Sequence, residues 1–171
     1  SVTQRLIAEA ERVSGDKFAF TARTPKGAMV YGVKKPASEM LKAIDKGLND
    51  LFIISRKNGF YSRLKYSDYT VFIAKPDRLN DGDGNYIPNF KVPLNQYKGS
   101  DYDAGGYMYA AGMVIAYNPA AFIIAENKKK LGQVSEVVRY EGEHIVLYHN
   151  DRKRYNETAD HSKGGSHPIL Q

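Results

Sequence analysis

The strongest constraint on the fold lies near the C-terminus, where a helical segment carries ionisable side chains on the face that should be buried. Because each residue of an α-helix turns by about 100°, residues 137–151 (VVRYEGEHIVLYHND) place Glu141, His144 and Asp151 among apolar side chains on one side. Burying an unpaired charge is costly, so these groups must satisfy one another, bind a cation or line a cleft. We therefore expect the three side chains to point inward and to meet, and this stripe is the candidate functional site.

The hydrophobic pattern predicts an α+β fold with a mostly antiparallel sheet. Apolar residues at helical spacing predict an N-terminal helix that ends at Gly15, and a second helix that begins near residues 36–38 and ends before Asn58. Runs of β-branched and aromatic residues predict strands, on which the C-terminal helix that carries the stripe is expected to pack. Residues 152–171 show neither pattern and are predicted to be irregular. The predicted strands are residues 18–20, 28–33, 69–74, 107–117 and 121–125.

Length and composition bound the class of protein. A chain of 171 residues is long enough for one domain with a substantial core, so residues 1–171 are expected to form a single domain. No apolar run approaches the roughly 20 residues that cross a bilayer, and no membrane partner is expected. The formal net charge of +6 would suit an anionic partner, but the basic residues are spread along the chain. A solubilising surface is therefore favoured over a nucleic-acid interface.

The chain contains no cysteine, so it has no disulfide, no thiolate metal ligand and no cysteine nucleophile. Any metal site must therefore consist of His, Asp and Glu side chains. The first residue is Ser1 rather than Met, which suggests a removed leader or a trimmed N-terminus, although the residues near it lack the pattern of a signal peptide. The compartment is left open, with an extracytoplasmic location slightly favoured.

Residues 75–106 are predicted to be a long loop, because Pro, Gly, Asp and Asn interrupt any periodicity. Long loops inside a compact domain are commonly functional or mobile, and the alternative is a missed short strand near residues 86–92. Residues 81–85 (DGDGN) alternate acidic or amide side chains as calcium loops do, but Val92 stands where an EF-hand needs its bidentate glutamate. A simple turn is the preferred interpretation of this segment.

Residues 140–144 (YEGEH) resemble the His-Glu-x-x-His signature of zincin metallopeptidases, with Tyr140 in the place of the first zinc-binding histidine. They fit the inverted His-x-x-Glu-His form as well, with Glu143 in the position of the general base. The helical wheel favours the first form, because Glu141 shares the inner stripe with His144 whereas Glu143 points away. In zincins a strand that holds the substrate precedes the active-site helix, much as the strands predicted before residue 126 precede this one.

This resemblance implies a zincin-like domain that acts as a small metal-dependent hydrolase on a peptide or protein substrate, with zinc or another divalent metal ion as cofactor. Glu141 would be the general base that activates a metal-bound water. His144 would be a metal ligand, and Asp151 and His161 are the candidates for the remaining ligands. Tyr148, on the same helical face, would donate a hydrogen bond to the developing oxyanion.

Two other classes of function would use the same residues. Tyrosine at position 140 is a poor zinc ligand at neutral pH, and without a replacement ligand the stripe would be a buried polar network in a non-catalytic binding protein. In that case the long loop and the basic surface would contact the partner. The other class is a metal-dependent nuclease, in which the same carboxylates and histidines would act on nucleic acid.

Overall fold

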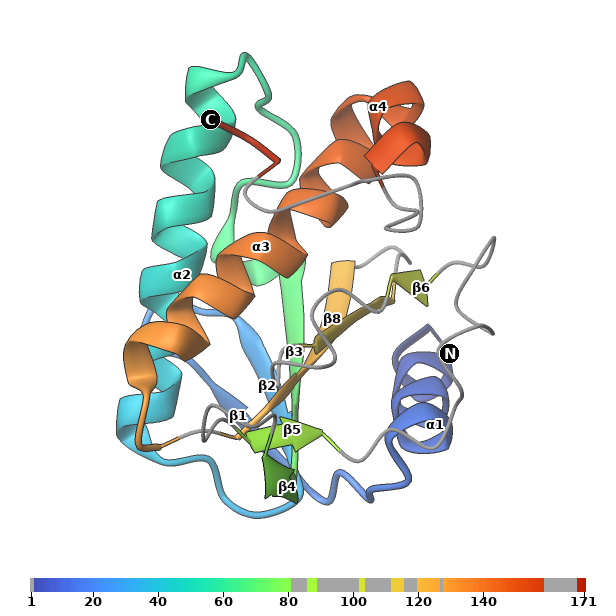
Figure 1. Ribbon diagram of the computed structural model, residues 1–171, viewed down its shortest axis with the longest axis vertical. Coiled ribbons are helices and arrows are strands. Elements are labelled where there is room, and N and C mark those ends of the chain that lie inside the picture. Colours follow the sequence, from blue (N-terminus) through green and yellow to red (C-terminus); the bar gives the residue numbers. More distant parts are fainter. Residues whose placement is uncertain are drawn as a thin grey trace.

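The chain combines helices with a mixed β-sheet in the computed structural model (Figure 1), which describes residues 2–80, 86–88, 102–103, 112–115, 120–126, 128–158 and 169–171. Among the helices of these residues, none has the length and apolar character needed to span a membrane. The helices are α1 (Val2–Ser14), α2 (Ser38–Lys57), α3 (Leu131–Asn150), α4 (Arg152–Thr158) and the 3₁₀ helix η1 (Tyr66–Asp68). The strands are β1 (Phe20–Arg23), β2 (Met29–Gly32), β3 (Tyr69–Ala74), β4 (Pro76–Asn80), β5 (Tyr86–Pro88), β6 (Tyr102–Asp103), β7 (Gly112–Ile115) and β8 (Ala120–Ala125).

A six-stranded sheet in the order β1-β2-β3-β8-β7-β6 forms the centre of the fold. The central pairs β2–β3 and β3–β8 are parallel, whereas β1–β2, β8–β7 and β7–β6 are antiparallel. Strands β4 and β5 form a separate antiparallel pair. The predicted α+β class is therefore confirmed, and antiparallel pairs outnumber parallel pairs among the described strands. The parallel centre is a feature that the sequence pattern did not predict.

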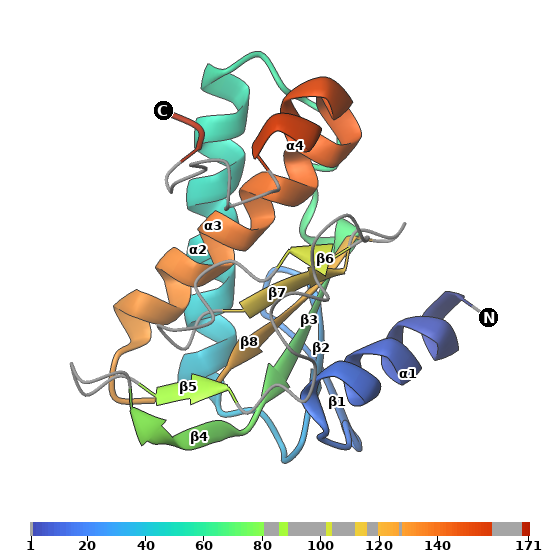
Figure 2. The same ribbon diagram turned by 45° about the vertical axis from the view of Figure 1, so that its right-hand side comes forward.

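The sheet separates two hydrophobic cores, because its central strands are buried on both faces. Helices α2 and α3 cover one face, and α1 lies against the other (Figures 1 and 2). Successive residues of a strand point to opposite faces, so Val71 and Ile73 of β3 join the core under α2 and α3. Phe72 and Ala74 join the other core, together with Leu6 of α1. Strands buried in this way read as continuous apolar runs, which is why β3 is recognisable in the sequence.

Helices α2 and α3 approach each other closely because small residues lie at their contact. A Cβ atom on Gly47 of α2 would lie 2.5 Å from the backbone oxygen of Ser135 and 2.7 Å from the Cβ atom of Val138, both on α3. The Ser135 hydroxyl also donates a hydrogen bond of 2.7 Å to the carbonyl oxygen of Ala43 on α2. Gly47 therefore sets the spacing between the two helices.

The helices and the first strand show where the sequence pattern succeeds and where it fails. Helices α1 and α2 lie where apolar spacing predicted them. Strand β1 begins at Phe20 rather than at residue 18, and Phe18 instead packs edge-on against Phe72 with 5.1 Å between ring centroids. Helix α4 lies in a stretch that was predicted to be irregular. Only Tyr155 is buried among its residues, so α4 carries no apolar periodicity.

The described part of residues 75–125 contains more strands than predicted. The predicted strands at residues 107–117 and 121–125 correspond to β7 and β8. Residues 75–106, predicted to be one long loop, contain the short strands β4, β5 and β6. The alternative of a short strand near residues 86–92 is thus confirmed in β5. The DGDGN segment, residues 81–85, lies outside the described residues.

Candidate functional site

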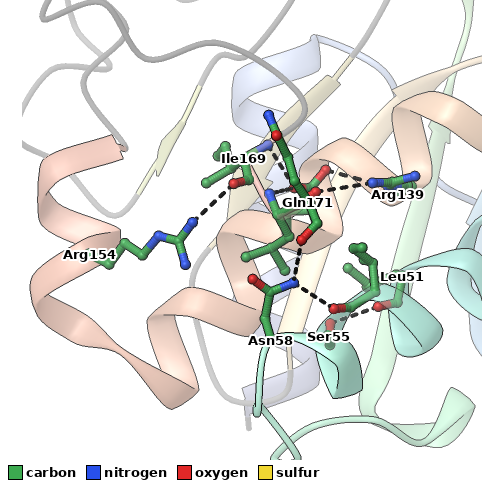
Figure 3. Close-up of polar contacts among 10 residues, drawn as sticks. Leu51, Ser55, Asn58, Arg139, Arg154, Ile169 and Gln171 are labelled. Carbon is green, nitrogen blue, oxygen red and sulfur yellow. Dashed lines mark hydrogen bonds and ion pairs between the residues drawn. The ribbon is translucent and has the colours of Figure 1, made fainter.

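The middle of α3 is buried around its whole circumference. Residues 141–147 are all buried, and the exposed fractions of Glu141, Glu143 and His144 are 1%, 0% and 0%. The predicted burial of Glu141 and His144 is confirmed, but the prediction that Glu143 points away from the core is wrong. The helix lies against α2, β7 and β8, and residues 169–171 cover a further side (Figure 3). A helical wheel of α3 cannot show the burial by residues 169–171, because these residues belong to a distant part of the chain.

Glu143 holds the C-terminal segment in place through its carboxylate. Its Oε2 atom accepts backbone N–H hydrogen bonds from Ile169 at 2.8 Å and from Leu170 at 2.5 Å. Its Oε1 atom lies 3.7 Å from Nε of Arg139, one turn earlier on α3. Arg139 in turn donates a hydrogen bond of 3.2 Å to the carbonyl oxygen of Leu170. The carboxylate therefore binds the backbone N–H groups of Ile169 and Leu170, and the guanidinium binds the carbonyl oxygen of Leu170.

Side chains of the neighbouring helices bind the same C-terminal segment (Figure 3). Arg154 of α4 donates a hydrogen bond of 3.1 Å to the carbonyl oxygen of Ile169. Asn58, at the end of α2, donates one of 3.4 Å from Nδ2 to the carbonyl oxygen of Gln171. The Leu170 side chain is fully buried in the core that α2 and α3 share. The last three residues therefore connect α2, α3 and α4.

The environment of Glu143 changes the proton affinity of its carboxyl group. Burial raises its pKa above the ordinary value of 4.5. The N–H groups of Leu170 and Ile169, together with nearby Arg139 and His144, act in the opposite direction by favouring the charged form, but burial is the larger effect. The folded protein therefore binds this proton more tightly than the unfolded chain does.

The raised pKa predicts that Glu143 stabilises the fold more in acid than at neutral pH. A carboxyl group whose pKa is higher in the folded state contributes most below its unfolded pKa, here 4.5, and this contribution is lost as the pH rises through the folded value. Glu143→Gln has no such proton. The unfolding free energy of the wild type, minus that of the variant, should therefore fall as the pH rises above 4.5. Urea denaturation of both proteins across this range tests the prediction, and a pH-independent difference would contradict it.

Asp151 is separate from Glu141 and His144 and instead caps the N-terminus of α4. Its carboxylate accepts the backbone N–H of Arg154 at 3.1 Å, which is the N-cap hydrogen bond of this helix. Seven residues of helix separate it from His144, which is about 10 Å along the axis. In the described part of the chain, no group of three or more His, Cys, Asp or Glu side chains could hold a metal ion. The structure therefore does not bring His144 and Asp151 together as ligands of one metal.

Tyr148 connects α3 to α4. Its ring meets the ring of Tyr155 edge-on, with 5.2 Å between centroids, and the Arg152 guanidinium lies 3.5 Å from the centroid of the Tyr148 ring. These contacts fix the junction of the two helices, so Tyr148 has a structural role. Its catalytic role stays a prediction. His161, the other predicted metal ligand, lies outside the described residues.

A concave site that the sequence pattern did not predict lies at the carboxyl ends of the parallel strands. Here β2, β3 and β8 end, α2 begins, and a cavity of about 300 Å³ is present. Ligands commonly bind outside the carboxyl ends of parallel strands. The sequence does carry a signal for this site, because a charged residue lies within two positions of the end of each strand, namely Lys34, Lys75 and Glu126. In the antiparallel sheet that the sequence pattern predicts, these residues would not all lie at the same edge. The cavity is lined by residues 32–37, Met40, residues 73–75 and Glu126.

Comparison with protein-family models, with curated proteins and with solved structures finds no match to this chain. Within the described residues, two places are therefore the candidates for a functional site. We name them the α3 cluster, which consists of Glu141, Glu143 and His144, and the strand-end cavity, which consists of the residues that line the cavity of about 300 Å³.

Proposed function

We propose that the chain is a small metal-dependent hydrolase of peptide bonds with its active site on α3. The observation that most strongly supports this proposal is the burial of a carboxylate and an imidazole, Glu141 and His144, one turn apart on the same helix. Burying an ionisable group is costly unless it has a partner, a bound cation or a functional role. Their spacing is that of the Glu and the second His in the zincin signature, which residues 140–144 resemble.

In this proposal each side chain of the helical face has one role. His144 would bind the metal ion through its neutral imidazole, and Glu141 would take a proton from the attacking water and pass it to the leaving amine. Tyr148 follows His144 by four residues and so shares its face of the helix, where the hydroxyl would donate a hydrogen bond to the developing oxyanion. The metal ion would supply the Lewis acidity that lowers the pKa of the water.

A complete metal site needs a ligand from outside the described residues. Those residues supply no group of three ligands, and Asp151 caps α4 instead. His161 belongs to the segment between Thr158, where α4 ends, and Ile169. Side chains of both α3 and α4 bind Ile169, which is the first described residue after this segment. His161 is therefore the stronger candidate for a second ligand.

Metal content and the hydrolytic activity of variants test the proposal. The wild-type protein, purified without chelator, should contain about one divalent metal ion per chain when its metals are measured by mass spectrometry. His144→Ala should lose the metal, whereas Glu141→Gln should keep it and hydrolyse a labelled protein substrate about 100-fold more slowly or worse. His149→Ala is the matched control, because it removes another imidazole of α3 that lies outside the stripe.

Circular dichroism of each variant separates a lost site from a lost fold. The proposal is refuted if the wild-type protein contains no metal and binds none when zinc is added. It is equally refuted if folded Glu141→Gln protein hydrolyses the substrate at the wild-type rate.

A non-catalytic binding protein is the second candidate, and the contacts of Glu143 favour it. Two backbone N–H groups and Arg139 surround this carboxylate, so at least one ionisable group of the α3 cluster serves the fold. In such a protein Glu141 and His144 would only fix α3 in the core, and a chelator would leave the melting temperature unchanged. A hydrolase with a bound metal would instead melt at a lower temperature after chelation, because a ligand of the folded state stabilises it.

A further inference from the structure

The strand-end cavity has an apolar floor that is built by the core. Met40 of α2 and Ile73 and Ala74 of β3 are buried and line it. Its volume of about 300 Å³ is at the lower end of the range for small-molecule sites, which is about 300–1,000 Å³. The floor therefore suits a compact ligand with a small apolar part.

The rim of the cavity carries more positive than negative charge. Lys34, Lys35 and Lys75 line it together with one carboxylate, Glu126. Lys34 lies 3.3 Å from this carboxylate and Lys128 lies 3.5 Å from it, and the Glu126 side chain is only 14% exposed. Within the part of the chain that the structure describes, Lys35 and Lys75 form no ion pair. Among the described residues, the two ammonium groups therefore have no ion-pair partner, and the nearby Asp16 carboxylate accepts the backbone N–H of Lys75 instead.

The start of α2 adds a partial positive charge at the same place. Pro36 and Ala37, which directly precede this helix, line the cavity. The N-cap residue Ala37 provides no side-chain hydrogen bond to the first turn, and the one acidic residue of that turn, Glu39, is exposed and does not line the cavity. A helix N-terminus carries roughly half a positive charge and offers N–H donors to an anion. The connection reaches this position through a tight turn, since a Cβ atom on Gly32 would lie 2.5 Å from the carbonyl oxygen of Lys34.

From these observations we infer that the strand-end cavity binds a small organic phosphate monoester. Such a group carries about −1.5 to −2 charges at neutral pH, which matches Lys35 and Lys75, the two rim lysines that form no ion pair with a described residue. Its oxygens accept hydrogen bonds from the start of α2, whereas a carboxylate would leave one lysine uncompensated. The apolar floor contacts the organic part, and Glu126 accepts a hydrogen bond from a ligand hydroxyl. The cavity shares no residue with the α3 cluster, so binding there does not depend on the proposed hydrolase activity.

Calorimetric titration with three probes tests this inference. Phenyl phosphate should bind with a Kd of about 1 mM or below. Benzoate, which has the same ring and one charge, and inorganic phosphate, which has no ring, should each bind at least about tenfold more weakly. The double variant Lys35→Ala/Lys75→Ala should lose at least about tenfold in affinity for phenyl phosphate. Lys42→Ala is the matched control, because Lys42 is an exposed lysine of α2 that does not line the cavity.

Each probe can also overturn the inference. Absence of phenyl phosphate binding would reject the site, and wild-type affinity in the folded double variant would reject its location. Benzoate binding as tight as that of phenyl phosphate would reject the requirement for a dianion. Inorganic phosphate binding equally tightly would reject a role for the apolar floor. Both lysines are exposed, so the melting temperature of the double variant should stay close to that of the wild type.

Discussion

Gly47→Ala is expected to lower the free energy of unfolding by about 3 kcal/mol, which is the upper part of the usual range for an overpacked contact. The new Cβ atom would lie 2.5 Å from the backbone oxygen of Ser135 and 2.7 Å from the Cβ atom of Val138. Neither atom moves when a side chain rotates, so the two helices themselves must separate. That separation would also strain the hydrogen bond from Ser135 to Ala43. Urea denaturation followed by circular dichroism measures the loss.

Gly132→Ala is the matched control, because a Cβ atom on this glycine of α3 has no atom within 4 Å. Alanine has a higher helix propensity than glycine, so this variant should be as stable as the wild type or up to about 1 kcal/mol more stable. Gly142→Ala should lie between the two, since its new Cβ atom meets the end of the flexible Leu51 side chain rather than backbone. Equal effects of the three substitutions would show that the close contact at Gly47 does not limit stability.

Glu143→Ala should lower the free energy of unfolding by about 2 kcal/mol and release the C-terminal segment. The substitution leaves the N–H groups of Ile169 and Leu170 without their acceptor, and each such loss costs about 1–3 kcal/mol. Removal of a buried charge offsets part of this cost. Hydrogen exchange at these two amides measures the release directly, and both should exchange much faster than in the wild type.

The control for this prediction is Glu136→Ala, which removes an exposed glutamate from the same helix. A surface substitution of this kind usually changes stability by no more than about 0.5 kcal/mol. Unchanged exchange at residues 169 and 170 in Glu143→Ala would show that contacts other than the carboxylate hold the segment. Arg139, Arg154 and Asn58 also hydrogen-bond to the segment, and the Leu170 side chain is buried in the core.

The elements that could be predicted from the sequence are those whose signal is local. Helix α2 has a clear apolar stripe, and β3 is an uninterrupted run of buried residues. Strand order has no such local signal. Val71 of β3 lies beside Val30 of β2 on one side and beside Phe122 of β8 on the other, and nothing in the three segments specifies a parallel register. The strand-end cavity was missed for the same reason, because it exists only when these strands run in one direction.

In the candidate site, too, some features depend on neighbouring residues and others depend on residues far away in the sequence. The burial of Glu141 and His144 could be predicted from the spacing of apolar residues around them. The burial of Glu143 could not, because it depends on residues 169–171, which follow α4. The helical stripe predicts Asp151 as a metal ligand, yet an aspartate directly before a helix is also the usual N-cap signal. That signal was hidden because α4, with Tyr155 as its single buried residue, was not recognised as a helix.

The pairing of β3 with β8 has a consequence for how the polypeptide is made. Tyr69 pairs with Ala120 and Ala74 with Ala125, so the middle of the sheet closes only after a long stretch of intervening sequence has left the ribosome. Until then the nascent chain carries β3 with one open edge, which is a surface prone to aggregation. Synthesis rate and chaperone supply should therefore affect the yield of this protein more than that of a domain built from neighbouring hairpins.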